Sequence, residues 1–323
     1  MKILVTRAWP KETQDRLITE NLGDITLRDP DTPMSVEDWI RAARAYDAIL
    51  PTVSDKIPTE FYPAAKGRLR ILANYGVGFN HIDIDAARAN GISVTNTPDV
   101  LTDCTADLAM GLMLAAARRI GEGERETRAG KWAGWRPTHM IGKKVSGATL
   151  GIIGFGRIGQ AVARRAHDGF GMRIVFQGNR AVSEEVKSAN GRATQLDSIT
   201  AVAAACDFLS LHCPGGAETR KMINADVFAA MKPGGILINT ARGDVVDEEA
   251  LFAALASGHL AAAGLDVYQN EPALDPRFLD HENIVLAPHL GSATYGTRAA
   301  MGHRAIDNLI AFLKGDVPPD LVA

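Results

Sequence analysis

The chain has 323 residues, of which 46% are hydrophobic and 23% are charged, and its formal net charge at pH 7 is −3. This length allows two domains, each with its own core, and the small charge gives no electrostatic basis for a nucleic-acid partner. The three cysteines, Cys104, Cys206 and Cys213, form no C-x-x-C pair. We therefore expect buried thiols, with neither a disulfide framework nor a metal site.

The sequence also argues against a membrane partner. The most apolar predicted helix, residues 106–117, contains Asp107, and it is shorter than the roughly 20 apolar residues that span a bilayer. Residues 1–6 have the pattern of a strand and not of a signal peptide. We therefore expect a cytoplasmic protein.

The first third of the chain alternates short apolar runs with helical patterns. Strands are predicted at residues 3–6, 25–27, 48–50, 71–73 and 92–94. Helices are predicted at 12–21, at 35–46 and at 83–89. Ser35 and Asp38 form a capping box for the second helix, and Asn90 and Gly91 end the third. This alternation predicts a parallel sheet with helices on both faces.

A second α/β series follows a long helix and an arm. The helix begins after Asp103, and residues 121–147 have no clean periodicity, which indicates an extended arm or loop. Further strands are predicted at 151–153, 173–176, 208–211, 235–238, 262–265 and 284–286, before a last helix at about 294–314. The second series is by itself a complete nucleotide-binding unit.

A glycine-rich turn opens this second series. Gly154, Gly156 and Gly159 follow a predicted strand with the G-x-G-x-x-G spacing. Such a turn lets the backbone approach a pyrophosphate at the N-terminus of the next helix. Alone it is weak evidence for a dinucleotide, so the segments around it decide its meaning.

Four further motifs stand in order around the turn. They are NYGVGFNHID at 74–83, NTARGDVVD at 239–247, GLDVYQNEP at 264–272 and LAPHLGS at 286–292. Together, these five motifs resemble the D-isomer-specific 2-hydroxyacid dehydrogenases, and most of all the glyoxylate/hydroxypyruvate reductases and glycerate dehydrogenases. The resemblance covers essentially the whole chain. It implies an oxidoreductase that transfers hydride between NAD(P)H and a small 2-oxo acid, with reduction of glyoxylate or hydroxypyruvate to glycolate or D-glycerate expected first.

The resemblance also implies the fold and the assembly. We expect two α/β domains with parallel, Rossmann-like or flavodoxin-like sheets, the dinucleotide domain being inserted into the substrate domain. The substrate domain is predicted at residues 1–98 and 290–323, and the dinucleotide-binding domain at 99–289. The protein is expected to be a homodimer, with the helix and arm at about 103–147 forming the contact between the two subunits.

Three residues are catalytic candidates. Arg242 follows a buried strand, and its planar guanidinium can hold a carboxylate and polarise a carbonyl. His289 can give a proton to an alkoxide and take it back. The resemblance places Glu271 beside this imidazole, where a carboxylate fixes the tautomer and favours the protonated ring. We interpret His81, in the first motif, as structural.

The substrate carboxylate is expected at the loop 74–78. Gly76 and Gly78 leave backbone amides open to an anion, and the resemblance assigns the carboxylate to this loop, from Asn74 onward, with the amides of Val77 and Gly78 as donors. A simple strand-to-helix turn is the alternative. Trp135 of the arm is expected to reach the partner's substrate site, and packing within its own subunit is the alternative.

The cofactor preference is predicted from the end of the strand at 173–176. NAD enzymes place an acid about 20 residues past the glycines, where it binds the ribose hydroxyls. Here Gly178 takes that place, and Asn179 and Arg180 follow. An arginine can pair with a 2′-phosphate that a carboxylate would repel. We predict that the protein prefers NADP(H), with NAD(H) as a second cofactor. The alternative is that the Arg180 side chain stacks on the adenine or lies in solvent.

The remaining cofactor contacts come from the resemblance alone. Asp266 is expected near the nicotinamide carboxamide, with a turn or cap residue as the alternative. The other expected contacts are Thr105, Phe155, Arg157, Ile158, Pro214, Thr240, Ala241 and Gly291.

A protein of another class shares these features. The C-terminal-binding corepressors sense NAD(P)(H) on the same fold and retain the arginine, the glutamate and the histidine. No long disordered tail or partner-binding extension occurs in this sequence, which favours an enzyme. Another D-2-hydroxyacid dehydrogenase is the further alternative.

Overall fold

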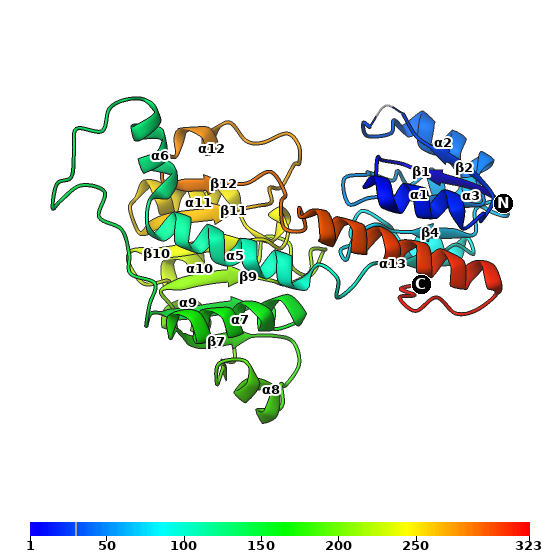
Figure 1. The fold of residues 1–323 in the computed structure, drawn as a ribbon. Helices are drawn as coiled ribbons and strands as arrows, with labels where there is room; N and C mark the ends of the chain where they lie inside the picture. The colour runs from blue at the N-terminus through cyan, green and yellow to red at the C-terminus, as the bar shows by residue number, and fades with distance from the viewer. Residues whose placement is uncertain (30) are drawn as a thin grey trace. The chain divides into compact units, whose positions relative to one another are not determined.

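The computed structural model describes residues 1–29 and 31–323, and the chain forms two compact units (Figure 1). Unit 1 comprises Met1–Leu101 and Ser292–Ala323, and unit 2 comprises Thr102–Gly291. Unit 2 is thus inserted into unit 1. The expected fold class, two parallel α/β domains with one inserted into the other, is confirmed.

Unit 1 is built on a five-stranded parallel sheet with the strand order β2-β1-β3-β4-β5. Its strands are β1 (Lys2–Val5), β2 (Asp24–Leu27), β3 (Ala48–Leu50), β4 (Ile71–Ala73) and β5 (Ser93–Thr95). Its helices are α1 (Lys11–Thr19), α2 (Val36–Ala45), α3 (Phe61–Ala65), α4 (Ile84–Ala89) and α13 (Tyr295–Lys314). The predicted capping box of Ser35 and Asp38 begins α2. The core between α2, α3 and the sheet contains Trp39, Phe61 and Tyr62.

The C-terminal tail is held to this unit by hydrogen bonds. The N–H of Val322 donates to the carbonyl oxygen of Val94 at 2.7 Å, so the tail continues the sheet beside β5. The buried carboxylate of Asp320 accepts hydrogen bonds from Arg304 Nε at 2.6 Å and from Asn308 Nδ2 at 2.9 Å. Charge-assisted bonds of this kind are stronger than neutral ones, so the tail is part of the folded unit.

Unit 2 has a seven-stranded parallel sheet with the order β12-β11-β10-β9-β6-β7-β8. Its strands are β6 (Thr149–Ile153), β7 (Arg173–Gln177), β8 (Thr194–Gln195), β9 (Phe208–Leu211), β10 (Gly235–Asn239), β11 (Leu260–Leu265) and β12 (Ile284–Leu286). Its helices are α5 (Thr102–Ala117), α6 (Ile120–Arg128), α7 (Arg157–Phe170), α8 (Glu184–Ala189), α9 (Ile199–Ala205), α10 (Ala225–Ala230), α11 (Glu248–Ala256) and α12 (Arg277–Asp280). The strand order reverses at β6, and such a switch point is where open α/β sheets bind ligands.

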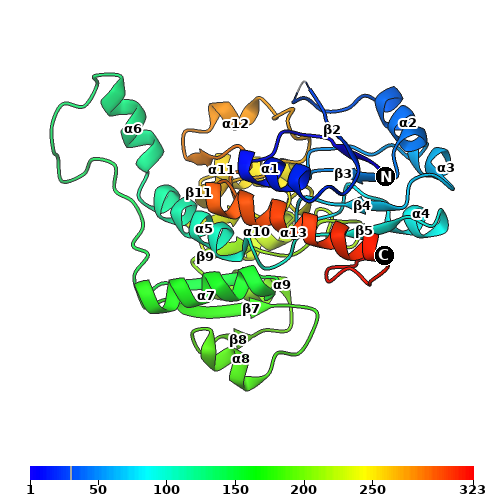
Figure 2. The same ribbon diagram turned by 45° about the vertical axis from the view of Figure 1, so that its right-hand side comes forward.

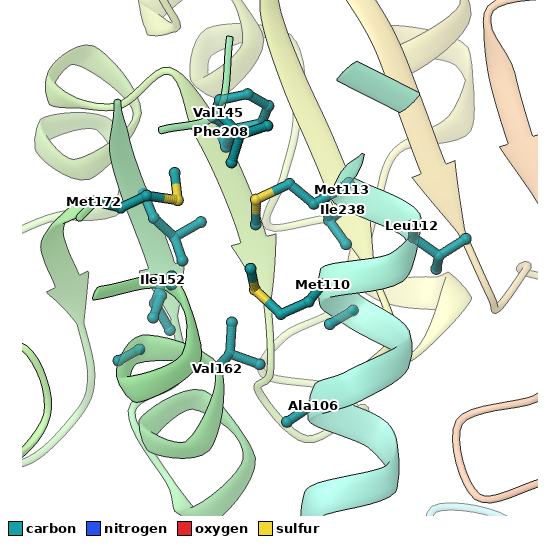
Figure 3. Packing of buried hydrophobic residues seen from close by; sticks show 14 of the residues in the cluster. Ala106, Met110, Leu112, Met113, Val145, Ile152, Val162, Met172, Phe208 and Ile238 are labelled. Carbon is teal, nitrogen blue, oxygen red and sulfur yellow. The ribbon is translucent and has the colours of Figure 1, made fainter. Parts of the chain in front are cut away.

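The long apolar helix is explained by burial inside unit 2. Met110 and Met113 of α5 point toward Val162 of α7 and Ile152 of β6, with Phe208 of β9 nearby (Figure 3). This packing covers one face of the sheet. In the described ranges, 1–29 and 31–323, no helix is long and apolar enough to cross a membrane.

The arm differs in part from the expectation. Its first segment is the helix α6. The residue before this helix, Arg119, has a backbone in the left-handed region, with φ 53°. Arg119 pairs with Glu122, and Arg128 pairs with Glu124. Helix α6 has no buried residue, so it has no apolar stripe for sequence periodicity to detect. After α6 the arm is extended, and Figure 2 shows it as a long loop before β6.

Candidate active site

The carboxyl ends of the parallel strands in unit 2 bring the predicted site residues to one edge of the sheet. Arg242 follows β10, Glu271 follows β11 and His289 follows β12, and these three strands are neighbours. The glycine-rich turn follows β6 at the switch point, and Asn179 follows β7. The sheet edge therefore carries the catalytic candidates at one end and the predicted phosphate-binding loop toward the other.

The glycines of the turn serve two different purposes. A Cβ at Gly154, which has φ +90°, would lie 2.6 Å from the backbone nitrogen of Cys213, and a Cβ at Gly159 would lie 2.2 Å from the carbonyl oxygen of Gly154. The fold itself requires glycine at these two places. A Cβ at Gly156 would meet no atom within 4 Å, and its φ is −78°. Nothing in the described chain requires glycine there, and the open space suits a ligand that approaches the backbone closely.

The helix that follows the turn is open to an anion. Gly156 is the N-cap of α7 and provides no side-chain hydrogen bond to the first N–H groups of this 14-residue helix. Those groups and the helix dipole favour a negatively charged ligand. Nearby on the same sheet edge, Thr240 Oγ1 is buried and has no hydrogen-bond partner within the described ranges. These features fit a dinucleotide along this edge.

Arg242 is held by the backbone of its own turn. Asn239 Nδ2 donates to the carbonyl oxygen of Arg242 at 2.9 Å, and Asn239 Oδ1 accepts the N–H of Ala241 at 3.0 Å. A Cβ at Gly243 would lie 1.9 Å from the carbonyl carbon of Tyr268, so the turn packs directly on the segment after β11. Burial lowers the pKa of Arg242, although the carboxylate of Glu271 acts in the opposite direction. An arginine stays cationic under such a shift.

His289 and Glu271 form a hydrogen-bonded pair. Nδ1 of His289 lies 2.7 Å from Oε2 of Glu271, whose Oε1 accepts the N–H of Tyr268 at 2.9 Å. Burial raises the pKa of Glu271, but the bond and charge of His289, the Tyr268 N–H and the charge of Arg242 outweigh it, so the pKa lies below its ordinary value. An ionised carboxylate only accepts, so Nδ1 carries a proton and Nε2 is the ring nitrogen that can exchange one with a substrate.

Asp266 supports the backbone of the segment that carries His289. Its Oδ1 accepts the N–H of Leu290 at 2.6 Å, its Oδ2 accepts the N–H of Gly291 at 2.8 Å, and its carbonyl oxygen accepts the N–H of His289 at 3.0 Å. These bonds hold His289 at φ 57°, which a non-glycine residue adopts only where its surroundings enforce it. Burial raises the pKa of Asp266. Thr105 Oγ1 donates to the carbonyl oxygen of Gly291 at 3.0 Å and completes the support.

The predicted substrate loop belongs to unit 1 and is organised by side chains. Asn74 Nδ2 donates to the carbonyl oxygens of Gly76 at 2.9 Å and Gly78 at 3.1 Å, and Asn74 Oδ1 lies 3.1 Å from His81 Nε2. The backbone N–H groups of Val77 and Gly78 have no hydrogen-bond acceptor in the described part of the chain. The loop therefore presents two donors side by side, as anion-binding backbone does.

Residues 110–291 match the family model for the D-isomer specific 2-hydroxyacid dehydrogenase, NAD binding domain. The chain belongs to this family. The resemblance inferred from the five motifs is thereby confirmed, and a nicotinamide dinucleotide is the cofactor of the matched domain.

Relatives match this D-2-hydroxyacid dehydrogenase over nearly its whole length. A glyoxylate reductase of Thermococcus kodakarensis is 44% identical over 99% of this chain and 96% of its own. A glycerate dehydrogenase of Hyphomicrobium methylovorum is 39% identical over 97% of this chain and 96% of its own. The solved structure of an NADPH-dependent glyoxylate/hydroxypyruvate reductase from Sinorhizobium meliloti, in complex with NADP and malonate, has a TM-score of 0.85 and 35% identity, and covers 100% of this chain and 96% of that one.

Other predicted positions of this dehydrogenase lie after strands at the same sheet edge or elsewhere in unit 2. Asn179 and Arg180 are exposed after β7, and the exposed Pro214 follows β9. The ring of Phe155 stacks on Phe176 at a centroid distance of 3.8 Å. Trp135 of the arm is 82% exposed. No group of three or more His, Cys, Asp or Glu side chains suited to a metal occurs within residues 1–29 and 31–323.

Proposed function

We propose that this enzyme reduces glyoxylate and hydroxypyruvate with NADPH, and that Arg242, Glu271 and His289 carry the reaction. The observation that supports this most strongly is the order of residues along one sheet edge. A guanidinium, a carboxylate and an imidazole follow three adjacent strands, and a glycine-rich anion site follows the switch-point strand. The names of the relatives from Thermococcus kodakarensis and Hyphomicrobium methylovorum point to the same substrates.

In the proposed mechanism, each residue acts on one part of a 2-oxo acid. When bound, reduced nicotinamide supplies the hydride to the carbonyl carbon. The amides of Val77 and Gly78 bind the substrate carboxylate, and Arg242 binds the carboxylate and the carbonyl oxygen. As the carbonyl π electrons move onto oxygen, His289 Nε2 donates its proton there, and the imidazole becomes neutral. Glu271 stabilises the protonated ring before transfer and keeps the proton on Nδ1.

The preference for NADPH rests on the loop after β7. Arg180 is exposed and has no hydrogen bond or ion pair from its guanidinium to the described residues, and neither Gly178 nor Asn179 supplies a carboxylate. A 2′-phosphate would give this cation a partner, whereas the hydroxyls of NADH would not. The NADPH dependence named for the Sinorhizobium meliloti enzyme supports this. NADH is proposed as the weaker cofactor.

The enzyme is also proposed to act as a homodimer. The arm exposes Trp132 and Trp135 at 56% and 82%, and exposed aromatic side chains of this size are typical of interfaces. In this proposal Trp135 contributes to the partner's substrate site. Light scattering would then give the mass of two chains, and Trp135→Ala would raise KM for hydroxypyruvate while the dimer persists.

Steady-state assays test the proposed function. Glyoxylate, hydroxypyruvate, pyruvate and phenylpyruvate are each mixed with NADPH or NADH, and the loss of reduced-nicotinamide absorbance is followed. We expect turnover with the first two substrates and a higher kcat/KM with NADPH. Tight binding of NADPH without turnover of any substrate would instead indicate a cofactor-sensing protein, and an NADH preference would refute the role given to Arg180.

A further inference from the structure

The loop after β7, residues 178–182, is held by one side chain from the neighbouring strand. Gln195 ends β8, which pairs with β7 at the end of the sheet (Figure 2). Gln195 Nε2 donates to the carbonyl oxygens of Arg180 at 3.0 Å and of Gly178 at 3.4 Å, and Gln195 Oε1 accepts the N–H of Val182 at 3.2 Å. A single amide group thus joins the beginning, the middle and the end of the loop.

These bonds fix the backbone and leave the cation exposed. The carbonyl group of Arg180 is bound to Gln195, while its guanidinium has no protein partner in the described ranges. At the far end of the loop, Val182 packs against the hydrophobic cluster that includes α7 and β6. The loop is therefore ordered from behind, and its charged and polar side chains remain available on the solvent side.

From this geometry we propose that Gln195 is a positioning residue that sets how tightly the 2′-phosphate of NADPH is bound. The inference rests on the NADPH preference proposed above. A loop that is already ordered loses less conformational entropy when it binds a ligand. Gln195 is uncharged and bonds backbone groups, so its effect on the phosphate would pass through Asn179 and Arg180.

Glutamine has the chemistry that this place needs. Its terminal amide combines two N–H donors and one accepting oxygen on the same carbon. A glutamate could accept from Val182 but could not donate to the carbonyl oxygens of Gly178 and Arg180. An apolar side chain of similar length would leave all three backbone groups without this partner.

Calorimetric titration with cofactor fragments tests the inference without turnover. Adenosine 2′,5′-bisphosphate carries the 2′-phosphate and AMP does not. The variants are Gln195→Met, which has a similar length, and Gln195→Asn, which keeps the amide but is one methylene shorter. The matched control is Gln14→Met in unit 1, where Gln14 Nε2 donates to the carbonyl oxygen of Trp9 at 2.8 Å.

We expect both Gln195 variants to weaken binding of the bisphosphate by about 5- to 10-fold and binding of AMP by no more than about twofold. The control variant should bind both fragments as the wild type does. In assays, KM for NADPH should rise while kcat and KM for NADH stay unchanged.

Three results would overturn the inference, and they differ in whether they also contradict the proposed NADPH preference. A wild-type protein that binds AMP and the bisphosphate equally would overturn the NADPH preference as well. A wild type that prefers the bisphosphate, with variants that keep this preference, would overturn the role of Gln195 alone. Equal weakening of both fragments would assign Gln195 to general support of the adenosine site. Should Gln195→Met not fold, Gln195→Asn provides the same comparison.

Discussion

Glutamine in place of Glu271 perturbs the proposed acid–base pair without changing its shape. In the wild type, one carboxylate oxygen lies 2.7 Å from His289 Nδ1 and the other accepts the N–H of Tyr268 at 2.9 Å. A carboxylate accepts at both oxygens, whereas an amide has one accepting oxygen and one donating nitrogen. Whichever way the new amide faces, one of these two bonds is lost.

The size of the effect follows from the charge on the ring. A hydrogen bond to a charged group is worth about 1.5–3 kcal/mol, and about 1.4 kcal/mol corresponds to a tenfold change in rate. The protonated ring of His289 would lose this stabilisation in Glu271→Gln. Because reduction needs that proton, we expect kcat/KM for glyoxylate to fall about 10- to 100-fold.

The assay is kcat/KM for glyoxylate at saturating cofactor at about pH 7. The matched control is Glu248→Gln, because Glu248 Oε1 accepts the N–H of Gln269 at 2.9 Å in the same unit and is half-buried. Its kcat/KM should equal that of the wild type. An unchanged kcat/KM in Glu271→Gln, or an equal loss in the control, would refute the reasoning.

The same substitution is predicted to change the pH dependence of thermal stability. The pKa of Glu271 is below its ordinary value of 4.5 because burial, which raises it, is outweighed by its partners. A carboxyl group with a lowered pKa in the folded state contributes stability above its ordinary pKa, and this contribution is lost as pH falls through the lowered value. The difference in Tm between wild type and Glu271→Gln should therefore be larger near about pH 7 than near about pH 3. A difference that grows in acid would contradict the pairing.

Three further substitutions test other parts of the structure. Arg242→Lys keeps the charge but loses the planar fork, so kcat/KM for glyoxylate should fall by about 10²-fold or more while Kd for NADPH stays unchanged; a loss within about threefold would remove Arg242 from the site. Gly154→Ala places a Cβ 2.6 Å from the backbone nitrogen of Cys213 at φ +90°, and should lower the free energy of unfolding in urea by about 2–4 kcal/mol. Its control, Gly156→Ala, should keep that stability and weaken NADPH binding; the reverse pattern would contradict the division between the two glycines. Asp320→Asn should lower the free energy of unfolding by about 1–3 kcal/mol in the same urea assay. An unchanged urea midpoint of unfolding would show that other contacts hold the C-terminal tail.

The strands and the order of motifs were open to prediction from the sequence, because short apolar runs and glycine turns are local signals. Each catalytic candidate could be placed after a strand. That β11 lies between β10 and β12, so that Glu271 stands next to both partners, is a property of strand pairing. Pairing order depends on contacts between distant segments, and only the family resemblance carried that information beforehand.

The elements that were missed have weak local signals for physical reasons. Strand β8 has two residues, Thr194 and Gln195, which is too short for any alternation of polar and apolar residues. Within residues 1–29 and 31–323, the hydrogen bonds of the Gln195 side chain all go to backbone groups, and any residue type can supply such a group. The sequence therefore gives no sign of these partners. Asp266 likewise supports backbone N–H groups of Leu290 and Gly291. Bonds between a side chain and the backbone of a distant segment leave no local pattern in the sequence.

The sheet separates chemistry from cofactor selection, and this predicts how two substitutions combine. Glu271 follows β11, whereas Gln195 ends β8, five strand positions away in the order of the sheet. At about 4.8 Å per strand this separates them by about 24 Å, and effects of substitutions farther apart than about 10 Å usually add within about 0.5 kcal/mol. In Glu271→Gln combined with Gln195→Met, the losses in kcat/KM for NADPH should therefore multiply to within about a factor of two. A larger deviation would mean that the loop after β7 communicates with the acid–base pair, and the two ends of the sheet edge would have to be treated as one site.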